Sequence, residues 1–420
     1  MLAPFRGVRY DLSRVGGLAN VTSPPYDVIG PGTLEQLRAA SPHNVVRLIL
    51  PDYAPGAAAA AVRAADSAAA ALLHDWLAEG ALKIDDRPAI YVYEQRGPGW
   101  VQRGLIALVA VGTDAVHPHE GVMPGPVAGR RELMKATRSN LEPILLAYNG
   151  DGSAASASAL TDQIADSGEP IVSAVTDDGV THRLWAITDP AAQQALTADL
   201  GTRTALIADG HHRYAAYREL RAELRAAGAG DGPWDYGLAF LVDVQAYPLH
   251  LGPIHRVLPG LGPDEAARLA AGAFTVTDLP DDLESALGSL EKAAESGHAF
   301  LLAGRGGFRL LTEPDQGQLD AAMPPGASAR WRALDASVMR ELLFGRVWSI
   351  KDNERDVQIS HDAAEAVRMA ADAGGTAVLS NPMPISAVME IAAHGEQVPR
   401  KSTSFGPKPR TGVVLRTFDA

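Results

Sequence analysis

The sequence contains no cysteine. This absence excludes disulfides, thiol nucleophiles and cysteine-based zinc sites, so any metal would need histidine and carboxylate ligands. The chain also lacks an excess of basic residues, since its 420 residues carry a formal net charge of −13. Nonspecific nucleic-acid binding depends on lysine and arginine that neutralise phosphates. The charge therefore opposes a nucleic-acid partner.

Long hydrophobic runs are absent as well. The run at residues 105–111 (LIALVAV) is far too short to span a bilayer. The first ten residues include Arg6 and Arg9 and have no apolar core of the kind found in signal peptides. These features predict a cytoplasmic protein without a membrane partner. The standard phosphate-loop, dinucleotide and serine-nucleophile motifs are also missing from the sequence.

Helical and strand-like patterns mix without strict alternation, which predicts an α+β fold. The length suggests two or three lobes. We expect three, at residues 1–115, 116–260 and 261–420. We expect helices at residues 31–40, 57–79, 130–138, 190–200, 211–226, 263–271, 281–295, 333–342 and 362–373. We expect strands at residues 5–12, 45–50, 89–94, 102–111, 143–148, 171–176, 182–188, 204–208, 236–243, 299–303, 307–311, 376–380 and 411–416.

The polar run at residues 209–214 (DGHHRY) is the most informative stretch, because it follows an apolar strand and opens an expected helix. A helix N-terminus has free N–H groups and a partial positive charge, which favour phosphate. Arg213 can add a planar fork of donors, and Gly210 allows close approach to the backbone. The histidines His211 and His212 can titrate near neutrality or bind metal. Alternatively, the acid simply caps the helix and the histidines pack at an interface.

A second candidate stretch lies at residues 117–120 (HPHE). Its histidines and acid could ligate a metal, or Glu120 could act as a general base beside His119. A solvated loop explains the same residues equally well. Asp27 follows two prolines, so it is either a carboxylate placed by a rigid loop or part of an Asx turn.

Two basic stretches could bind anions. Residues 130–142 hold Arg130, Arg138 and Asn140, although a solvated helix is the more ordinary interpretation of this stretch alone. Residues 400–410 (RKSTSFGPKPR) carry four cations in an acidic chain. They could form a loop that closes over an anionic substrate, or a charged surface loop.

Several of these motifs together resemble the bacterial and archaeal family catalogued as domain of unknown function 1015. The matching segments are residues 23–29 (SPPYDVI), 119–120 with Arg130, 136–144 (ATRSNLEPI), 208–214 (ADGHHRY), 254–257 (IHRV), and 401–403 with Phe405, 407–408 and 412–414. The chain departs from the family where Gly121 and Val122 replace a common Arg-Thr pair. It departs again where Gly129 replaces a common acid.

The DGHHR run is also similar to the nucleotide-binding motif of the ParB/sulfiredoxin-like superfamily, which includes a free serine kinase. This resemblance implies a ParB/sulfiredoxin-like central lobe with a mixed sheet and flanking α/β lobes. It further implies a kinase that uses ATP or ADP with Mg²⁺ on a small hydroxy compound such as serine.

The resemblance implies roles for the residues already singled out. The catalytic set is Glu120, Asp209, His211 and His212, with Asp209 also as the metal ligand. The phosphate-binding set is Gly210, Arg213, Tyr214, Arg130 and Asn140. The substrate-binding or anion-binding set is Asp27, His119, Lys401, Ser402, Thr403 and Lys408.

Two other functions stay open at this point. The same turn could serve a phosphatase or nucleotide hydrolase, with water as acceptor. It could also serve a non-catalytic nucleotide or metabolite sensor. The expected partners are a small substrate and a nucleotide, and a homodimer is left open.

Overall fold

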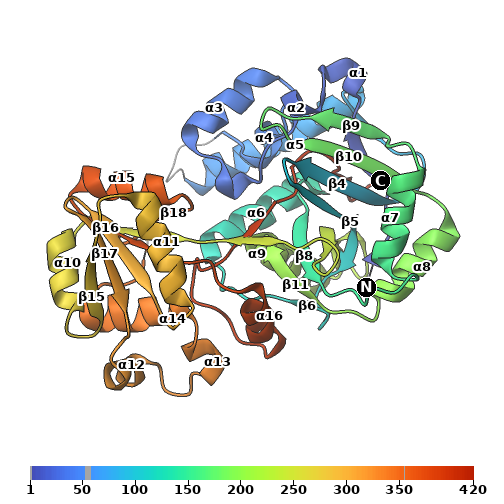
Figure 1. Cartoon of the computed structure of the whole chain (residues 1–420). Coiled ribbons are helices and arrows are strands. Elements are labelled where there is room, and N and C mark those ends of the chain that lie inside the picture. The colour runs from blue at the N-terminus through green and yellow to red at the C-terminus, as the bar shows by residue number, and fades with distance from the viewer. Residues whose placement is uncertain (1, 53–57, 354) are drawn as a thin grey trace. The chain divides into compact units, whose positions relative to one another are not determined.

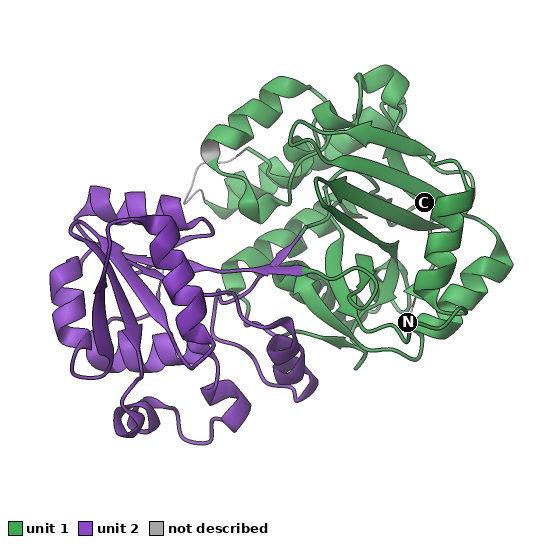
Figure 2. Cartoon of the chain, in the orientation of Figure 1, with its two compact units in different colours: residues 1–118, 122–249, 407–420 green, residues 119–121, 250–406 purple. Residues whose placement is uncertain are grey.

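The computed structural model describes residues 2–52, 58–353 and 355–420, which form two compact units (Figure 2). Unit 1 comprises Met1–Pro118, Val122–Leu249 and Pro407–Ala420. Unit 2 comprises His119–Gly121 and His250–Gly406. The chain therefore leaves unit 1 twice and returns to it for its last residues.

Unit 1 is built on a nine-stranded mixed sheet with the order β6-β11-β8-β12-β5-β4-β10-β9, in which β1 also pairs with β5 (Figure 1). Most neighbours are antiparallel, while β11 with β6 and β12 with β8 are parallel. The strands are β1 (Leu2–Ala3), β4 (Ile90–Gly97), β5 (Trp100–Ala110), β6 (Val116–His117), β8 (Ile144–Tyr148), β9 (Val172–Val175), β10 (Thr181–Ile187), β11 (Ala205–Asp209) and β12 (Tyr236–Asp243).

Small strand pairs and helices complete unit 1. The pairs are β2 (Val8–Tyr10) with β3 (Leu82–Ile84), and β7 (Ser139–Asn140) with β21 (Arg416–Thr417). The helices are α1 (Leu12–Val15), α2 (Leu18–Val21), η1 (Tyr26–Val28), α3 (Pro31–Ala40), α4 (Val46–Ile49), α5 (Ala59–Ala78), α6 (Pro124–Thr137), α7 (Ala157–Ser167), α8 (Pro190–Leu200), α9 (His211–Ala226) and η2 (Pro233–Asp235).

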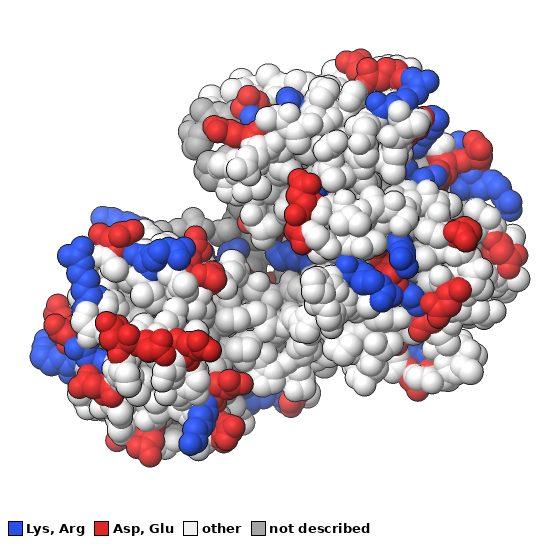
Figure 3. All heavy atoms as spheres, turned by 45° about the horizontal axis from the view of Figure 1, so that its top comes forward, with Lys and Arg blue, Asp and Glu red and all other residues white. Residues whose placement is uncertain are grey.

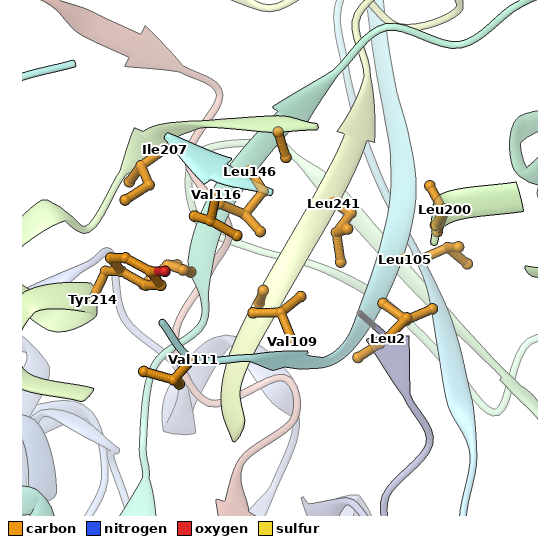
Figure 4. Close-up of a cluster of buried hydrophobic side chains, with 14 of the residues drawn as sticks. Leu2, Leu105, Val109, Val111, Val116, Leu146, Leu200, Ile207, Tyr214 and Leu241 are labelled. Carbon is orange, nitrogen blue, oxygen red and sulfur yellow. The ribbon is translucent and has the colours of Figure 1, made fainter. Parts of the chain in front are cut away.

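The largest hydrophobic core of unit 1 joins this sheet to α7, α8 and α9. Alternate strand residues point to one face, as the side-chain period of two requires. Figure 4 shows Leu105 and Val109 from β5, Leu146 from β8 and Leu241 from β12 in this cluster, together with Tyr214 from α9. The core therefore fixes the position of β11 and α9, whose junction holds the DGHHR run.

Unit 2 has a six-stranded antiparallel sheet of order β15-β17-β16-β19-β14-β18. Its strands are β15 (Thr275–Leu279), β17 (Gly307–Thr312), β16 (Phe300–Gly304), β19 (Thr376–Leu379), β14 (His255–Leu258) and β18 (Gln358–Ser360), with β13 (His250–Gly252) and β20 (Ser404–Gly406) as a separate pair. Its helices are α10 (Pro263–Ala270), α11 (Leu283–Ala294), α12 (Gln316–Ala322), α13 (Ala329–Arg332), α14 (Asp335–Val338), η3 (Met339–Val347), α15 (Ala363–Ala373) and α16 (Ile385–Ala393).

The mixture of sheets and helices confirms the predicted α+β class. The expected helices at residues 31–40, 190–200 and 211–226 and the strand at 236–243 match the structure to the residue. The long alanine-rich helix is confirmed as α5, although Ala57, its expected first residue, lies outside the described residues.

Several expected elements are wrong in type or extent. Residues 45–50, predicted as a strand, contain the short helix α4 (Val46–Ile49), and the Val46 N–H donates to Oδ1 of Asn44 just before it. Five of the six residues in this run are apolar, so the sequence has no period that separates strand from helix. Residues 5–12 and 411–416 contribute only β2 and the start of β21 as strands. The helix predicted at 333–342 is divided between α14 and the π-helix η3.

The helix α6 begins at Pro124, six residues before its predicted start. Proline lacks a backbone N–H, but the first turn of a helix does not need that donor. The two prolines at residues 124 and 126 therefore fit the first turn of α6 and do not exclude a helix there.

The two units differ from the three expected lobes. Strands from residues 1–115 and from residues 116–260 pair in one sheet, so both expected lobes fall within unit 1. Residues 407–420, expected in the C-terminal lobe, also belong to unit 1 because β21 pairs with β7. The three-lobe division thus separates segments that these strand pairings join in one unit.

The surface carries mixed charges. On the face shown in Figure 3, lysine and arginine lie interspersed with aspartate and glutamate. None of the helices in the described ranges is long and apolar enough to cross a bilayer.

Candidate functional site

The DGHHR run forms the turn between β11 and α9, as the sequence predicts. Gly210 adopts φ +92°, a left-handed conformation that side chains disfavour. A Cβ at this position would lie 2.8 Å from Cγ2 of Ile144, so the turn requires glycine. No side chain caps the start of α9, and His211 and His212 are half-buried. The first turn of α9 is therefore partly open to solvent.

Two cations hold the carboxylate of Asp209 at this turn. Its Oδ2 accepts from Nη2 of Arg213 at 2.5 Å, and its Oδ1 pairs with Nζ of Lys408 at 2.6 Å. Lys408 also lies 3.4 Å from Oδ2 of Asp27, in η1. Burial lowers the pKa of Lys408, but the two carboxylates outweigh it and raise that pKa above its usual value. The ammonium thus stays charged between two acids from distant parts of the chain.

Behind Asp209 lies a buried layer of paired charges. Arg213 is 2% exposed, and its Nη1 donates to the Pro143 carbonyl at 2.6 Å. Arg130 lies 4.3 Å from the centre of the Tyr26 ring and 3.9 Å from Oε2 of Glu142. Burial raises the pKa of Glu142, whose carboxylate accepts from the Tyr26 N–H. This layer fixes the orientation of Asp209 and of the loop that carries Asp27.

Four residues predicted to bind phosphate or nucleotide are buried, and their side chains contact other parts of the protein. Arg213 and Arg130 are buried and donate to Asp209, Pro143 and Ile49. Asn140 is buried and accepts from Nη1 of Arg416. Tyr214 is buried in the core of unit 1 (Figure 4). Arg213 thus supports the turn through Asp209, whereas Arg130 and Asn140 make these contacts elsewhere in unit 1 and Tyr214 packs into the core.

His212 links the starts of two helices. Its Nε2 accepts from the N–H of Met123, the residue that precedes α6, at 3.1 Å. A neutral imidazole that accepts at Nε2 carries its proton on Nδ1. The ring therefore connects the N-terminus of α6 to the first turn of α9, within unit 1.

The second predicted stretch is divided, because His117 lies on β6 of unit 1 whereas His119 and Glu120 lie in unit 2. His119 and Glu120 belong to a separate polar group, here called the Glu120 cluster: His119, Glu120, Arg256, Lys401 and Thr403. Glu120 Oε1 accepts from the Lys401 N–H at 2.7 Å, and its Oε2 lies 3.4 Å from Oγ1 of Thr403. The same hydroxyl lies 2.8 Å from Nε2 of His119. Removal from water raises the pKa of Glu120, partly offset by these contacts.

Arg256 ties the Glu120 cluster to the loop at residues 400–403. Its Nη2 donates to the Lys401 carbonyl at 2.8 Å, and burial lowers its pKa. Lys401 has φ +54°, a conformation that non-glycine residues rarely adopt. Ser402 turns its hydroxyl to the Pro399 carbonyl at 2.6 Å. Of the predicted substrate residues, Lys401 and Thr403 thus contact Glu120, whereas Lys408 belongs to the turn in unit 1.

Neither group is an assembled multi-ligand metal centre. Within the described ranges, no three histidine or acidic side chains gather in a way that could hold a metal ion. Magnesium, however, is commonly held by one or two carboxylates together with substrate phosphates. Asp27 and Asp209, which share one ammonium, fit that smaller requirement.

Sequence reasoning assigned no role to Tyr26, Glu142 or Arg256. Each lies inside a segment that matches the family, so the sequence did mark these positions. What the pattern could not give was the partner of each residue, because Tyr26 and Glu142 are 116 positions apart and meet only in the fold.

Several solved structures have low similarity to the chain. A free serine kinase in complex with AMP is 17% identical, with a TM-score of 0.36 over 72% of this chain and 87% of that one. A conserved hypothetical protein from Pyrococcus furiosus is 16% identical, with a TM-score of 0.37 over 74% and 95%. SbnI from Staphylococcus aureus, truncated at its C-terminus, is 12% identical, with a TM-score of 0.35 over 72% and 82%.

No curated protein matches the chain. The family model described as protein of unknown function (DUF1015) matches residues 2–337, most of the sequence. This protein therefore belongs to the DUF1015 family.

Proposed function

We propose that the protein is a nucleotide-dependent phosphotransferase that acts on a small hydroxy compound such as serine. The observation that carries this proposal is the charged ammonium of Lys408 beside the uncapped start of α9. A lysine and a helix N-terminus together form a common arrangement for nucleotide phosphates. The resemblance of the DGHHR run to the ParB/sulfiredoxin-like nucleotide motif supports the same assignment.

Phosphoryl transfer depends mainly on positioning of the reactants and on neutralisation of charge, and the turn could provide both. Free N–H groups of the first turn of α9 would bind phosphate oxygens, and Gly210 would let them approach the backbone. Lys408 would move from its carboxylates toward the phosphate. Arg213 would keep Asp209 in place from behind, since its two terminal nitrogens are already engaged.

Asp209, with Asp27 beside it, would hold Mg²⁺ when a nucleotide is bound. The ion would add positive charge at the phosphates. Both carboxylates already lie around one cation, the Lys408 ammonium, so the site accepts positive charge. His211 and His212 flank the same turn and complete the proposed polar front.

Glu120 is the proposed group that accepts the proton from the acceptor hydroxyl. A general base works best when its pKa is close to the operating pH, and the raised pKa of Glu120 moves in that direction. His119, Lys401, Ser402 and Thr403 are the proposed contacts for the acceptor.

A thermal-shift panel tests nucleotide binding. ATP, ADP, CTP and pyrophosphate, each with and without Mg²⁺, are added to wild type, Lys408→Met and the control Lys83→Met. Lys83 also pairs with an aspartate in unit 1 but lies on β3. A ligand that binds only the native state raises the Tm by mass action. We expect a nucleotide-dependent rise in wild type and in the control, and none in Lys408→Met.

Two results would contradict the proposal. Absence of a shift with every nucleotide removes the phosphate site. An equal shift in Lys408→Met places the phosphates away from this turn. Phosphate release from ATP without an acceptor would instead identify the protein as a nucleotide hydrolase.

A further inference from the structure

Unit 2 contains a pocket that the proposed reaction does not use. Its volume is about 530 Å³, and it lies among the end of α11, the segment from α13 to α14 and the start of α16. This size is within the range of small-molecule sites. Most of the wall is apolar, with Ala294, Ala333, Leu334, Met383 and Ala387 among the lining side chains.

A histidine held by an aspartate faces this pocket. His298 and Asp335 both line it, and Nδ1 of the histidine lies 2.6 Å from Oδ1 of the aspartate. An ionised carboxylate can only accept, so Nδ1 carries the proton in this pair. In the neutral imidazole Nε2 is then an acceptor, and it bonds to none of the residues in the described ranges. Such a carboxylate-held imidazole is pre-oriented to accept a hydrogen bond from a ligand.

The charges of the pocket limit the ligand further. Arg330 also lines the wall, but it pairs with Glu390 at 3.5 Å and with Glu396. Its positive charge is therefore already matched, and Asp335 adds a negative one. A carboxylate or phosphate ligand would meet this excess of acids, whereas an uncharged ligand would not.

We propose that this pocket is a second small-molecule site, specific for an uncharged ligand with an apolar ring and one N–H or O–H donor directed at His298. The apolar wall would cover the ring, and Nε2 of His298 would accept the donor. The residues involved all belong to unit 2, and the inference does not depend on the proposed phosphotransferase activity.

Three matched probes test the proposal: indole, which has a ring N–H; benzofuran, in which oxygen replaces that N–H; and indole-3-acetate, which adds a negative charge. The readout is the ε-methyl NMR signal of Met383, which lines the pocket, in protein labelled with ¹³C-methyl methionine. The chain has 8 methionines, so Met383→Leu assigns this signal. We expect saturable indole binding, about five-fold weaker benzofuran binding and still weaker indole-3-acetate binding.

Variants of His298 and Asp335 provide a second test of the proposal. His298→Ala should reduce indole affinity about five-fold, to that of benzofuran. Asp335→Asn keeps the ring but removes its fixed tautomer, so we expect a smaller loss. His74→Ala, an exposed histidine on α5 of unit 1, is the control and should change nothing. Equal binding of indole and benzofuran by wild type would overturn the proposal without any mutation, as would a Met383 signal that does not move.

Discussion

At the scale of single residues, the β11–α9 turn shows what a local pattern can and cannot predict. A glycine between an apolar strand and a polar helix start predicted the turn, because few residues other than glycine tolerate a left-handed backbone. The sequence also indicated Lys408 as a binding residue. It could not indicate that Lys408 pairs with Asp209, since 199 positions separate them and no local periodicity records that contact.

Replacing Gly210 by alanine should destabilise unit 1 by about 2–4 kcal/mol, because it adds strain in the backbone and a clash with Ile144. Gly228→Ala is the matched control, since Gly228 has φ +83° but open space around it. The control should lose only about 1 kcal/mol. Urea denaturation measures both losses. Equal losses would show that the contact with Ile144 has no part in the requirement for glycine.

At the scale of elements, period and caps predicted most of the fold. The amphipathic helix α9 and the buried strand β12 were predicted to the residue. The failures come from segments without a period. The apolar run at residues 45–50 contains the short helix α4, and β21 has two residues because only those pair with β7. Tertiary contacts determine the secondary structure of such segments, so local sequence patterns could not predict it.

The strand β10 carries a buried histidine that should make stability depend on pH. His182 lies 2.8 Å from the Tyr93 hydroxyl and 3.0 Å from that of Thr176, and burial lowers its pKa to about 4. The unfolded chain binds the proton near pH 6.5, so it holds more protons than the native state between pH 6.5 and 4. Stability should therefore fall as the pH falls through this window, by up to about 3 kcal/mol from this residue.

Denaturation at pH 7 and pH 4.5 tests this dependence in wild type, His182→Gln and the exposed control His74→Gln. We expect His182→Gln to be less stable at pH 7 but to lose less between the two pH values. The control should follow wild type. A pH dependence that is identical in all three proteins would mean that protonation of His182 does not drive the loss.

At the scale of the whole molecule, the chain divides its polar residues between two units. The sequence predicted both polar groups, but it placed residues 407–420 in the last lobe. The pairing of β7 with β21 returns this segment to unit 1 and brings Lys408 to the β11–α9 turn. Local sequence patterns do not reveal contacts between such distant segments of the chain.

The proposed base belongs to this scale, because Glu120, Arg256 and the loop at residues 400–403 come from distant parts of the sequence and meet in one cluster. Glu120→Gln should lower turnover by about 10²- to 10⁴-fold and leave the nucleotide-induced rise in Tm intact. Activity of wild type should rise with pH through the raised pKa of Glu120, since a base must be ionised to accept a proton. Glu265→Gln, an exposed acid on α10, is the control. Unchanged turnover in Glu120→Gln would remove this residue as the base.

The most direct test of the account is ³¹P NMR of the protein with ATP, Mg²⁺ and a panel of small hydroxy compounds that includes serine. Phosphoryl transfer at the β11–α9 turn predicts ADP and a new phosphate monoester signal with at least one acceptor, in wild type and in Lys83→Met but not in Lys408→Met. ADP with inorganic phosphate as the sole other product would contradict it in favour of hydrolysis. Unchanged ATP with every acceptor would contradict phosphoryl transfer altogether.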